Sequence, residues 1–164
     1  MAKIDDMAQE FLALKKIAVV GVSDKRETGS NMAYDKFKAN GYQVFPVNPR
    51  LSEFKGEPCY PDLKSIPETP EGVFILASPK VTDDLVQQCV DLGIKNVWMH
   101  CMMGTKPGIA KSMTSVSQDA VQMCRENGIQ VIPGSCPNQF LDPDFGHTMM
   151  RGMWRIFGFM KVDA

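Results

Sequence analysis

The segment from Gly21 to Ser30 carries residue types that bind phosphate. It follows a continuous apolar run, 17–20, and directly precedes a stretch with helical periodicity. Gly21 and Gly29 allow a ligand to approach the backbone, and the start of a helix offers unpaired N–H groups and positive dipole charge. Further side-chain donors are Ser23, Lys25 and Arg26. The segment, which also includes Val22, therefore predicts a phosphate cradle.

The glycines of this segment do not form the dinucleotide fingerprint G-x-G-x-x-G. Seven residues separate Gly21 from Gly29, and no glycine stands two residues after Gly21. Any strand that leads into a helix needs a tight turn, so a purely structural role for these glycines stays open. The segment alone does not decide which phosphate-bearing ligand it would hold.

A second group of residues, at the end of the run 43–47, bears on the choice of ligand. Proteins that bind NAD at a glycine-containing turn between a strand and a helix usually place a carboxylate about 20 residues beyond the glycines. This carboxylate binds the ribose 2′-hydroxyl. The residues found here are Val47, Asn48, Pro49 and Arg50. Arg50 suits an additional phosphate on the ribose, unless it is an ordinary solvated charge. NAD is therefore disfavoured, whereas NADP and coenzyme A, which both carry such a phosphate, remain.

Two further groups stand at the ends of later apolar runs. The first consists of Ala77, Ser78 and Pro79, and the second of Met99 and His100. Small residues and a proline let a flat, extended group lie against the backbone. Carboxyl ends of parallel strands meet at one edge of a sheet, so both groups are predicted to lie near the phosphate cradle.

His100, Cys101 and Cys136 are predicted to fall at the ends of neighbouring strands. Three such ligands could hold zinc, and Cys101 could form a mixed disulfide with a bound thiol. Their spacing matches no metal motif, so a lining role is favoured and no metal is predicted. With two histidines and no nucleophile-elbow sequence, the chain offers no recognisable set of nucleophile, base and orienting acid. These residues favour binding over catalysis.

The scaffold that brings these groups together must alternate apolar strands with helices. The predicted strands span 17–21, 43–47, 73–77, 96–99 and 129–132. The predicted helices span 30–40, 82–92 and 115–127, the second of them capped by Thr82. This alternation predicts an α/β fold with a Rossmann-like, doubly wound, mostly parallel five-stranded sheet and helices on both faces.

The remaining segments fit one domain over residues 1–164. An N-terminal helix is predicted within 1–15, and the proline-rich connection 48–71 is predicted to contain a short helical turn at 62–65. The apolar tail 145–164 is predicted to form a helix packed on the domain. A homodimer contact through this tail is the alternative.

Charge and composition limit the classes of partner. The chain has 18 basic and 19 acidic side chains, which gives no field that would attract nucleic acid. Its first ten residues contain no long apolar run, so neither a secretory signal nor a membrane anchor is predicted. Five cysteines without the spacing of a disulfide scaffold indicate free thiols in a reducing compartment, and hence the cytoplasm.

At four places the sequence resembles stand-alone coenzyme A-binding domain proteins, which are related to the N-terminal domain of the succinyl-CoA synthetase alpha subunit. These places are Gly21-Val22-Ser23 with Gly29, the stretch 44–49, the turn Ala77-Ser78-Pro79 and the pair Val97-Trp98. The resemblance runs from about Lys16 to about Leu141. It implies a Rossmann-type fold and coenzyme A as the ligand.

The resemblance also implies a position for each candidate residue. At the diphosphate it places Val22, Ser23, Lys25 or Arg26, Gly29 and Ser30. Beside the adenosine and its 3′-phosphate it places Val47, Asn48, Pro49 and Arg50. Along the pantetheine arm it places Ala77, Ser78, Pro79, Met99 and His100.

The sequence departs from these relatives where the thiol of coenzyme A would lie. Many relatives have a glutamine and a Pro-Gly pair after the tryptophan, whereas this chain has His-Cys-Met-Met-Gly at 100–104. We predict that the chain binds coenzyme A or an acyl-CoA as a small non-catalytic module. The alternative is an NADP-linked or acyl-transferring enzyme that uses the same crevice.

Overall fold

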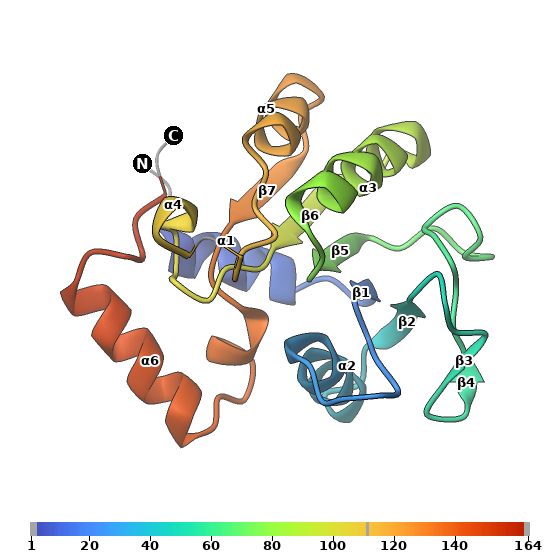
Figure 1. Ribbon diagram of the computed structural model, residues 1–164, viewed down its shortest axis with the longest axis horizontal. Coiled ribbons are helices and arrows are strands. Elements are labelled where there is room, and N and C mark those ends of the chain that lie inside the picture. The colour runs from blue at the N-terminus through green and yellow to red at the C-terminus, as the bar shows by residue number, and fades with distance from the viewer. Residues whose placement is uncertain (1–2, 111, 163–164) are drawn as a thin grey trace.

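A five-stranded parallel sheet forms the centre of the computed structural model, which describes residues 3–110 and 112–162 (Figure 1). Its strands are β1 (Lys16–Val20), β2 (Gln43–Val47), β5 (Gly72–Ile75), β6 (Asn96–Met99) and β7 (Gln130–Pro133). They lie in the order β2-β1-β5-β6-β7, and each neighbouring pair is parallel. The predicted Rossmann-like α/β fold is confirmed.

Helices cover both faces of this sheet. They are α1 (Ile4–Leu12), α2 (Gly29–Ala39), α3 (Pro79–Leu92), α4 (Pro107–Ala110), α5 (Gln118–Glu126), the 3-10 turn η1 (Pro137–Gln139) and α6 (Phe145–Ile156). In Figure 1, α3 and α5 lie on one side of the sheet and α1 and α2 on the other. The sheet has one hydrophobic core on each face, and alternate residues of β1 contribute to the two cores. Ala18 and Val20 pack with α3 and α5, and Ile17 and Val19 pack with α1 and α2. Strands buried on both faces explain the unbroken apolar runs in the sequence.

Trp98, the tryptophan of β6, anchors the second of these cores. Its side chain is fully buried, and its indole N–H donates to the carbonyl oxygen of Gly134 at 2.9 Å. The rings of Phe11 and Phe140 pack against it, with centroids at 5.3 and 5.6 Å. One side chain therefore connects α1 and the segment after β7 to β6 at the centre of the fold.

The helices predicted at 82–92 and 115–127 begin at other residues than expected. Helix α3 starts at Pro79, and the hydroxyl of Ser78 accepts from the backbone N–H of Val81, so the prediction of Thr82 as the cap was wrong. Proline suits the first helical position because a backbone N–H there would have no acceptor within the helix, so its absence loses no hydrogen bond. Helix α5 is capped by Ser117, and Ser115 lies in the preceding loop.

The connection 48–71 contains a small hairpin that the sequence did not reveal. Strands β3 (Glu53–Phe54) and β4 (Glu57–Pro58) pair antiparallel around Lys55 and Gly56, both of which have positive φ angles. At 62–65, where a short helical turn was expected, the chain forms a single hydrogen-bonded turn and no helix. A side-chain oxygen of Asp62 accepts from the backbone N–H of Ser65 at 2.8 Å, and the carbonyl oxygen of Leu63 accepts from the N–H of Ile66 at 3.3 Å.

The apolar tail forms helix α6, as expected, and this helix contacts the first helix of the chain. Asp5 of α1 accepts from Arg151 and Arg155 of α6, each at 2.5 Å. The predicted ranges 1–15 and 145–164 include residues 1–2 and 163–164, which lie outside the described residues. Among the helices described, none is both long and apolar enough to cross a membrane.

Candidate ligand-binding site

A cavity of about 1040 Å³ lies at the carboxyl edge of the sheet. Its walls come from the segments that follow β1, β5, β6 and β7 and from helix α6. Strand β1 lies between β2 and β5, so the strand order reverses here, and such a point is where open α/β sheets bind ligands. The predicted residues that line the cavity are Gly21, Val22, Ser23, Arg26, Gly29, Asn48, Ala77, Ser78, Pro79 and His100.

Gly21 brings the exits of β1 and β5 close together. Its φ angle is +97°, and a Cβ atom built on it would lie 2.1 Å from the carbonyl oxygen of Leu76. Its N–H donates to the carbonyl oxygen of Val47 at 3.1 Å. The glycine thus has a steric reason to be there, and it allows the backbone of the loop to border the cavity.

Asn31, which the sequence analysis missed, organises the loop between β1 and α2. Its side chain is almost fully buried. The side-chain oxygen accepts from the N–H of Ser23 at 2.8 Å and from the hydroxyl of Thr28 at 3.0 Å. The side-chain amide donates to the carbonyl oxygens of Ser23 at 2.8 Å and Arg26 at 3.3 Å. The Thr-x-x-Asn spacing at the start of a helix, a variant of the capping box, was the available signal.

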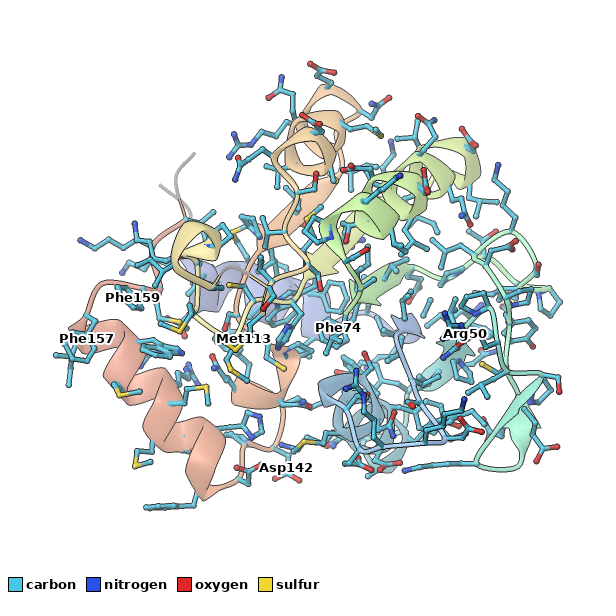
Figure 2. All side chains as sticks on the ribbon, in the orientation of Figure 1. Arg50, Phe74, Met113, Asp142, Phe157 and Phe159 are labelled. Atoms are coloured by element: carbon cyan, nitrogen blue, oxygen red, sulfur yellow. The ribbon has the colours of Figure 1, made fainter. Side chains whose placement is uncertain are left out.

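Three cations near this loop have side chains that make no hydrogen bond or ion pair within the described part of the chain. They are Lys25, Arg26 and Arg50. Arg26 lines the cavity, and Lys25 lines an adjoining hollow beside the β3–β4 hairpin. Arg50 is exposed and does not line the cavity, and Figure 2 shows it beside β2. These guanidinium and ammonium groups are available to an anion.

Some predicted residues lie around the cavity without lining it. Ser30, Val47 and Met99 are buried, and the Ser30 hydroxyl donates to the carbonyl oxygen of Val20 at 2.6 Å. Pro49 is exposed, and the neighbouring Arg50 N–H donates to the Asn48 side chain at 2.8 Å. Asn48 in turn donates to the carbonyl oxygen of Val22 at 2.7 Å. Since Asn48 links the two loops, it fixes the shape of this corner of the site.

A second residue that the sequence analysis missed, Asn138, joins η1 to the start of α2. Its side-chain amide donates to the carbonyl oxygen of Gly29 at 3.1 Å. Its side-chain oxygen is buried, lacks a hydrogen-bond partner among the described residues, and belongs to a residue that lines the cavity. A buried acceptor without a partner costs free energy, so this oxygen is suited to receive a donor from a ligand.

His100 lies at the exit of β6 with its ring against Phe74, the centroids being 6.3 Å apart. Burial lowers the pKa of His100 to about 4, so the imidazole is neutral near pH 7. A neutral ring can donate and accept one hydrogen bond each, but it offers no charge to a phosphate.

The buried His100 should make folding stability depend on pH. In the unfolded chain the imidazole titrates near pH 6.5 and binds more protons than in the fold, so the free energy of unfolding decreases as the pH falls from about 6.5 towards 4. We expect this decrease, measured by urea unfolding at about pH 7 and about pH 5, to be smaller in His100→Gln. Equal decreases in the two proteins would mean that His100 titrates normally in the fold.

The cysteines near the cavity are poor nucleophiles. Burial raises the pKa of the Cys101 thiol, and it raises that of Cys136 to about 12. A protonated, buried thiol neither attacks a disulfide nor binds a metal readily. Within residues 3–110 and 112–162, no three His, Cys, Asp or Glu side chains are grouped to hold a metal ion. The geometry gives no support to the zinc alternative.

The parallel sheet with a cavity at its carboxyl edge defines a Rossmann-like α/β protein, and solved structures share this fold. A redesigned form of the PH1109 protein is 26% identical, with a TM-score of 0.73 that covers 88% of this chain and 95% of that one. A hypothetical protein from Pyrococcus horikoshii OT3 is 29% identical, with a TM-score of 0.71 that covers 85% of this chain and 92% of that one.

The chain belongs to the family of CoA binding domains, because the model of that family matches residues 15–139. It is 27% identical over 122 residues to the uncharacterized protein YneT of Bacillus subtilis, a match that covers 74% of this chain and 82% of that protein. It is 23% identical over 122 residues to the ADP-forming acetate–CoA ligase I of Archaeoglobus fulgidus. That match covers 74% of this chain but 18% of the ligase, so the chain spans less than a fifth of that enzyme. The resemblance identified in the sequence is confirmed.

Proposed function

We propose that this protein binds coenzyme A or an acyl-CoA at the carboxyl edge of its sheet, as a binding module without catalytic activity of its own. The observation that supports this most is the continuity of the cavity, which runs from the loop after β1 to the exits of β5 and β6. Coenzyme A is a long molecule with a charged diphosphate in its middle and an uncharged arm at one end. It needs a polar loop and an extended, weakly polar channel in one site.

The diphosphate fits the start of α2. Gly29 and Ser30 are the first residues of this helix, so their N–H groups have no acceptor within it, and they lie at the positive end of the helix dipole. The free side chains of Lys25 and Arg26 add positive charge beside them. This combination of backbone donors and cations is the usual means by which such a loop binds phosphate.

The remaining parts of the ligand would extend from the diphosphate in two directions. Towards β2, the residues Val47–Arg50 would border the adenosine. Towards β5 and β6, Ala77–Pro79 and His100 would lie along the pantetheine arm. The arm contains two amide groups, and the unpaired side-chain oxygen of Asn138 is a suitable acceptor for one of their N–H groups.

The binding proposal is tested by isothermal titration of the purified protein with coenzyme A, acetyl-CoA, NADP and NAD. We expect a coenzyme A species to bind at least ~10-fold more tightly than either dinucleotide. Tighter binding of NADP would contradict the proposal and favour the alternative, an NADP-linked or acyl-transferring enzyme.

We also propose that the protein is located in the cytoplasm. Its five cysteines are all unpaired and buried, which agrees with a reducing compartment.

Arg50→Ala tests whether Arg50 contacts the 3′-phosphate on the ribose of coenzyme A. We expect this change to weaken the binding of coenzyme A at least ~5-fold and to affect dephospho-CoA much less, because a charge-assisted hydrogen bond contributes roughly 1.5 kcal/mol or more. The measurement is titration of both ligands into both proteins, with Lys64→Ala as a control, since Lys64 pairs with Asp91 away from the cavity. Equal losses of affinity for the two ligands would mean that Arg50 does not contact the 3′-phosphate.

We also propose that the outer face of α6 mediates a weak homodimer. This face carries five exposed apolar side chains, Phe145, Met149, Met153, Ile156 and Phe157. Both arginines of the helix, Arg151 and Arg155, are paired with Asp5, so like charges would not oppose a second copy of the face. The exposed apolar area is roughly 500 Å² per protomer, which is at the small end for a specific dimer.

Ile156→Glu is the test of this dimer. We expect light scattering over a concentration series to show a monomer–dimer equilibrium for the unchanged protein and a monomer for the variant, because a carboxylate would be buried without a partner. Ile109→Glu is the matched control, since Ile109 on α4 is similarly exposed but lies off the α6 face. A monomer at all concentrations of the unchanged protein would contradict the proposal.

A further inference from the structure

The end of the cavity beside α6 contains three methionines, two from the connection between β6 and α5 and one from α6. They are Met102 from the loop after β6, Met113 from the later part of the same connection, and Met150 from α6. Strand β6, which the loop with Met102 follows, lies two strand spacings from β1, or about 10 Å. In Figure 2, Met113 lies on the α6 side of the molecule and Arg50 on the opposite side, beside β2. The methionines therefore lie at the end of the site farthest from the proposed adenosine position.

The backbones of two of these methionines are fixed, whereas their side chains are not covered. The N–H of Met102 donates to the carbonyl oxygen of Met113 at 3.2 Å, and the Trp154 indole donates to the carbonyl oxygen of Met102 at 3.1 Å. The side chains of Met102 and Met113 are nevertheless 45% and 49% exposed. Methionine is flexible and polarisable, so this wall can adapt to an apolar group of variable length.

Charged groups lie at the other end of the cavity. Among the lining residues described, the side chains with a full charge are those of Arg26 and Glu27, both in the loop after β1. At the methionine end, the His147 imidazole has its Nδ1 atom 2.6 Å from a carboxylate oxygen of Asp144, so a proton on this ring is already paired. Among the described residues that line this end there is no unpaired cation, so a carboxylate brought here would lose water without gaining such a partner from them.

The geometry points to an apolar acyl group as the occupant of this end: we propose that the protein prefers a coenzyme A thioester of a medium-chain fatty acid over free coenzyme A and over a dicarboxylic acyl-CoA. This inference rests on the proposed function, since it places the diphosphate at the start of α2. In this orientation the thioester leaves the channel beside His100, and the acyl chain contacts Met102, Met113 and Met150.

The chain-length preference is measured by titrating the full chain with coenzyme A, acetyl-CoA, hexanoyl-CoA and succinyl-CoA. Burial of one methylene group strengthens binding up to about four-fold, and hexanoyl-CoA has four more methylenes than acetyl-CoA. With the chain partly exposed, we expect hexanoyl-CoA to bind at least ~10-fold more tightly than acetyl-CoA, and succinyl-CoA to bind more weakly than hexanoyl-CoA.

Two variants locate the preference in the structure. Met102→Gln and Met113→Gln keep the length of the side chain but make its end polar, so each should reduce the ratio of the acetyl-CoA to the hexanoyl-CoA dissociation constant at least ~3-fold. Ile109→Gln is the control, because Ile109 is similarly exposed but does not line this cavity. Its ratio should stay that of the unchanged protein.

The outcomes separate this inference from the proposed function. If coenzyme A and hexanoyl-CoA bind equally, the acyl site is wrong and coenzyme A binding stands. If succinyl-CoA binds most tightly, the apolar character assigned to this end is wrong. If no coenzyme A species binds, the proposed function and the inference that rests on it both fail.

Discussion

Gly21→Ala is expected to lower the free energy of unfolding by ~3 kcal/mol or more and to reduce coenzyme A binding below detection. The new Cβ atom would lie 2.1 Å from the carbonyl oxygen of Leu76. This backbone cannot easily withdraw, because the N–H of Leu76 donates to the carbonyl oxygen of Val20 at 3.2 Å. Relief of the clash would separate the exits of β1 and β5, between which the ligand is proposed to bind. Urea unfolding and titration calorimetry measure the two effects.

Gly93→Ala is the control for this experiment. Gly93 has a similar positive φ angle of +72° at the end of α3, but a Cβ atom at this position would have no other atom within 4 Å. The change should cost only the backbone strain, about 1 kcal/mol, and leave ligand affinity unchanged. If the two alanine variants were equally stable, close approach of the β5 backbone would not be the reason for glycine at position 21.

Asn31→Ala is expected to weaken coenzyme A binding at least ~30-fold and to lower the free energy of unfolding by roughly 2–3 kcal/mol. The change removes the side chain that holds the loop after β1 through Ser23, Arg26 and Thr28. A loop released in this way must be ordered again when the ligand binds, and that ordering costs conformational entropy. Titration calorimetry measures the affinity, and urea unfolding the stability.

Two variants test the specificity of the Asn31 effect. Asn40→Ala removes an exposed asparagine from the end of the same helix, where its amide donates to the carbonyl oxygen of Lys36 at 2.8 Å, and it should leave the affinity unchanged. Asn31→Asp keeps the acceptor oxygen but loses both donated hydrogen bonds and brings a negative charge towards the diphosphate. It should bind coenzyme A at least as weakly as Asn31→Ala. Full affinity in either Asn31 variant would show that the loop is ordered without this side chain.

The strands of the sheet could be predicted because burial on both faces leaves a strong local signal. The run Gln43–Val47 was assigned without error, and Asn96–Met99 likewise. The starts of helices were less certain, because Ser78, Thr82 and Ser117 are all residues that favour a cap. The choice among them depends on which hydroxyl reaches a free N–H. A proline at the first helical position, as Pro79 is here, pointed to Ser78 as the cap, and the prediction of Thr82 did not use this signal.

The candidate site could be predicted only as far as the loops that form it. Gly21 and Ser23 are recognisable because they stand where a strand gives way to a helix. Asn138 was missed because its role comes from a partner distant in sequence and from a buried oxygen, and neither is visible in local sequence. Asn31 was missed although its partners are local and its spacing from Thr28 was a signal. Met99 was expected to line the site, but a strand's last residues alternate in direction and its side chain is fully buried in the core.

The ion pairs between Asp5 and the arginines of α6 connect the first and last helices described. Burial opposes ionisation of Asp5, but hydrogen bonds from Arg151 and Arg155 lower its pKa below the ordinary value. Because His147 and Met150 on α6 also line the cavity, the two ion pairs hold this wall of the proposed binding site against the N-terminal helix. The cavity is therefore bordered by residues from both ends of the described chain, although most of its lining comes from the loops between them.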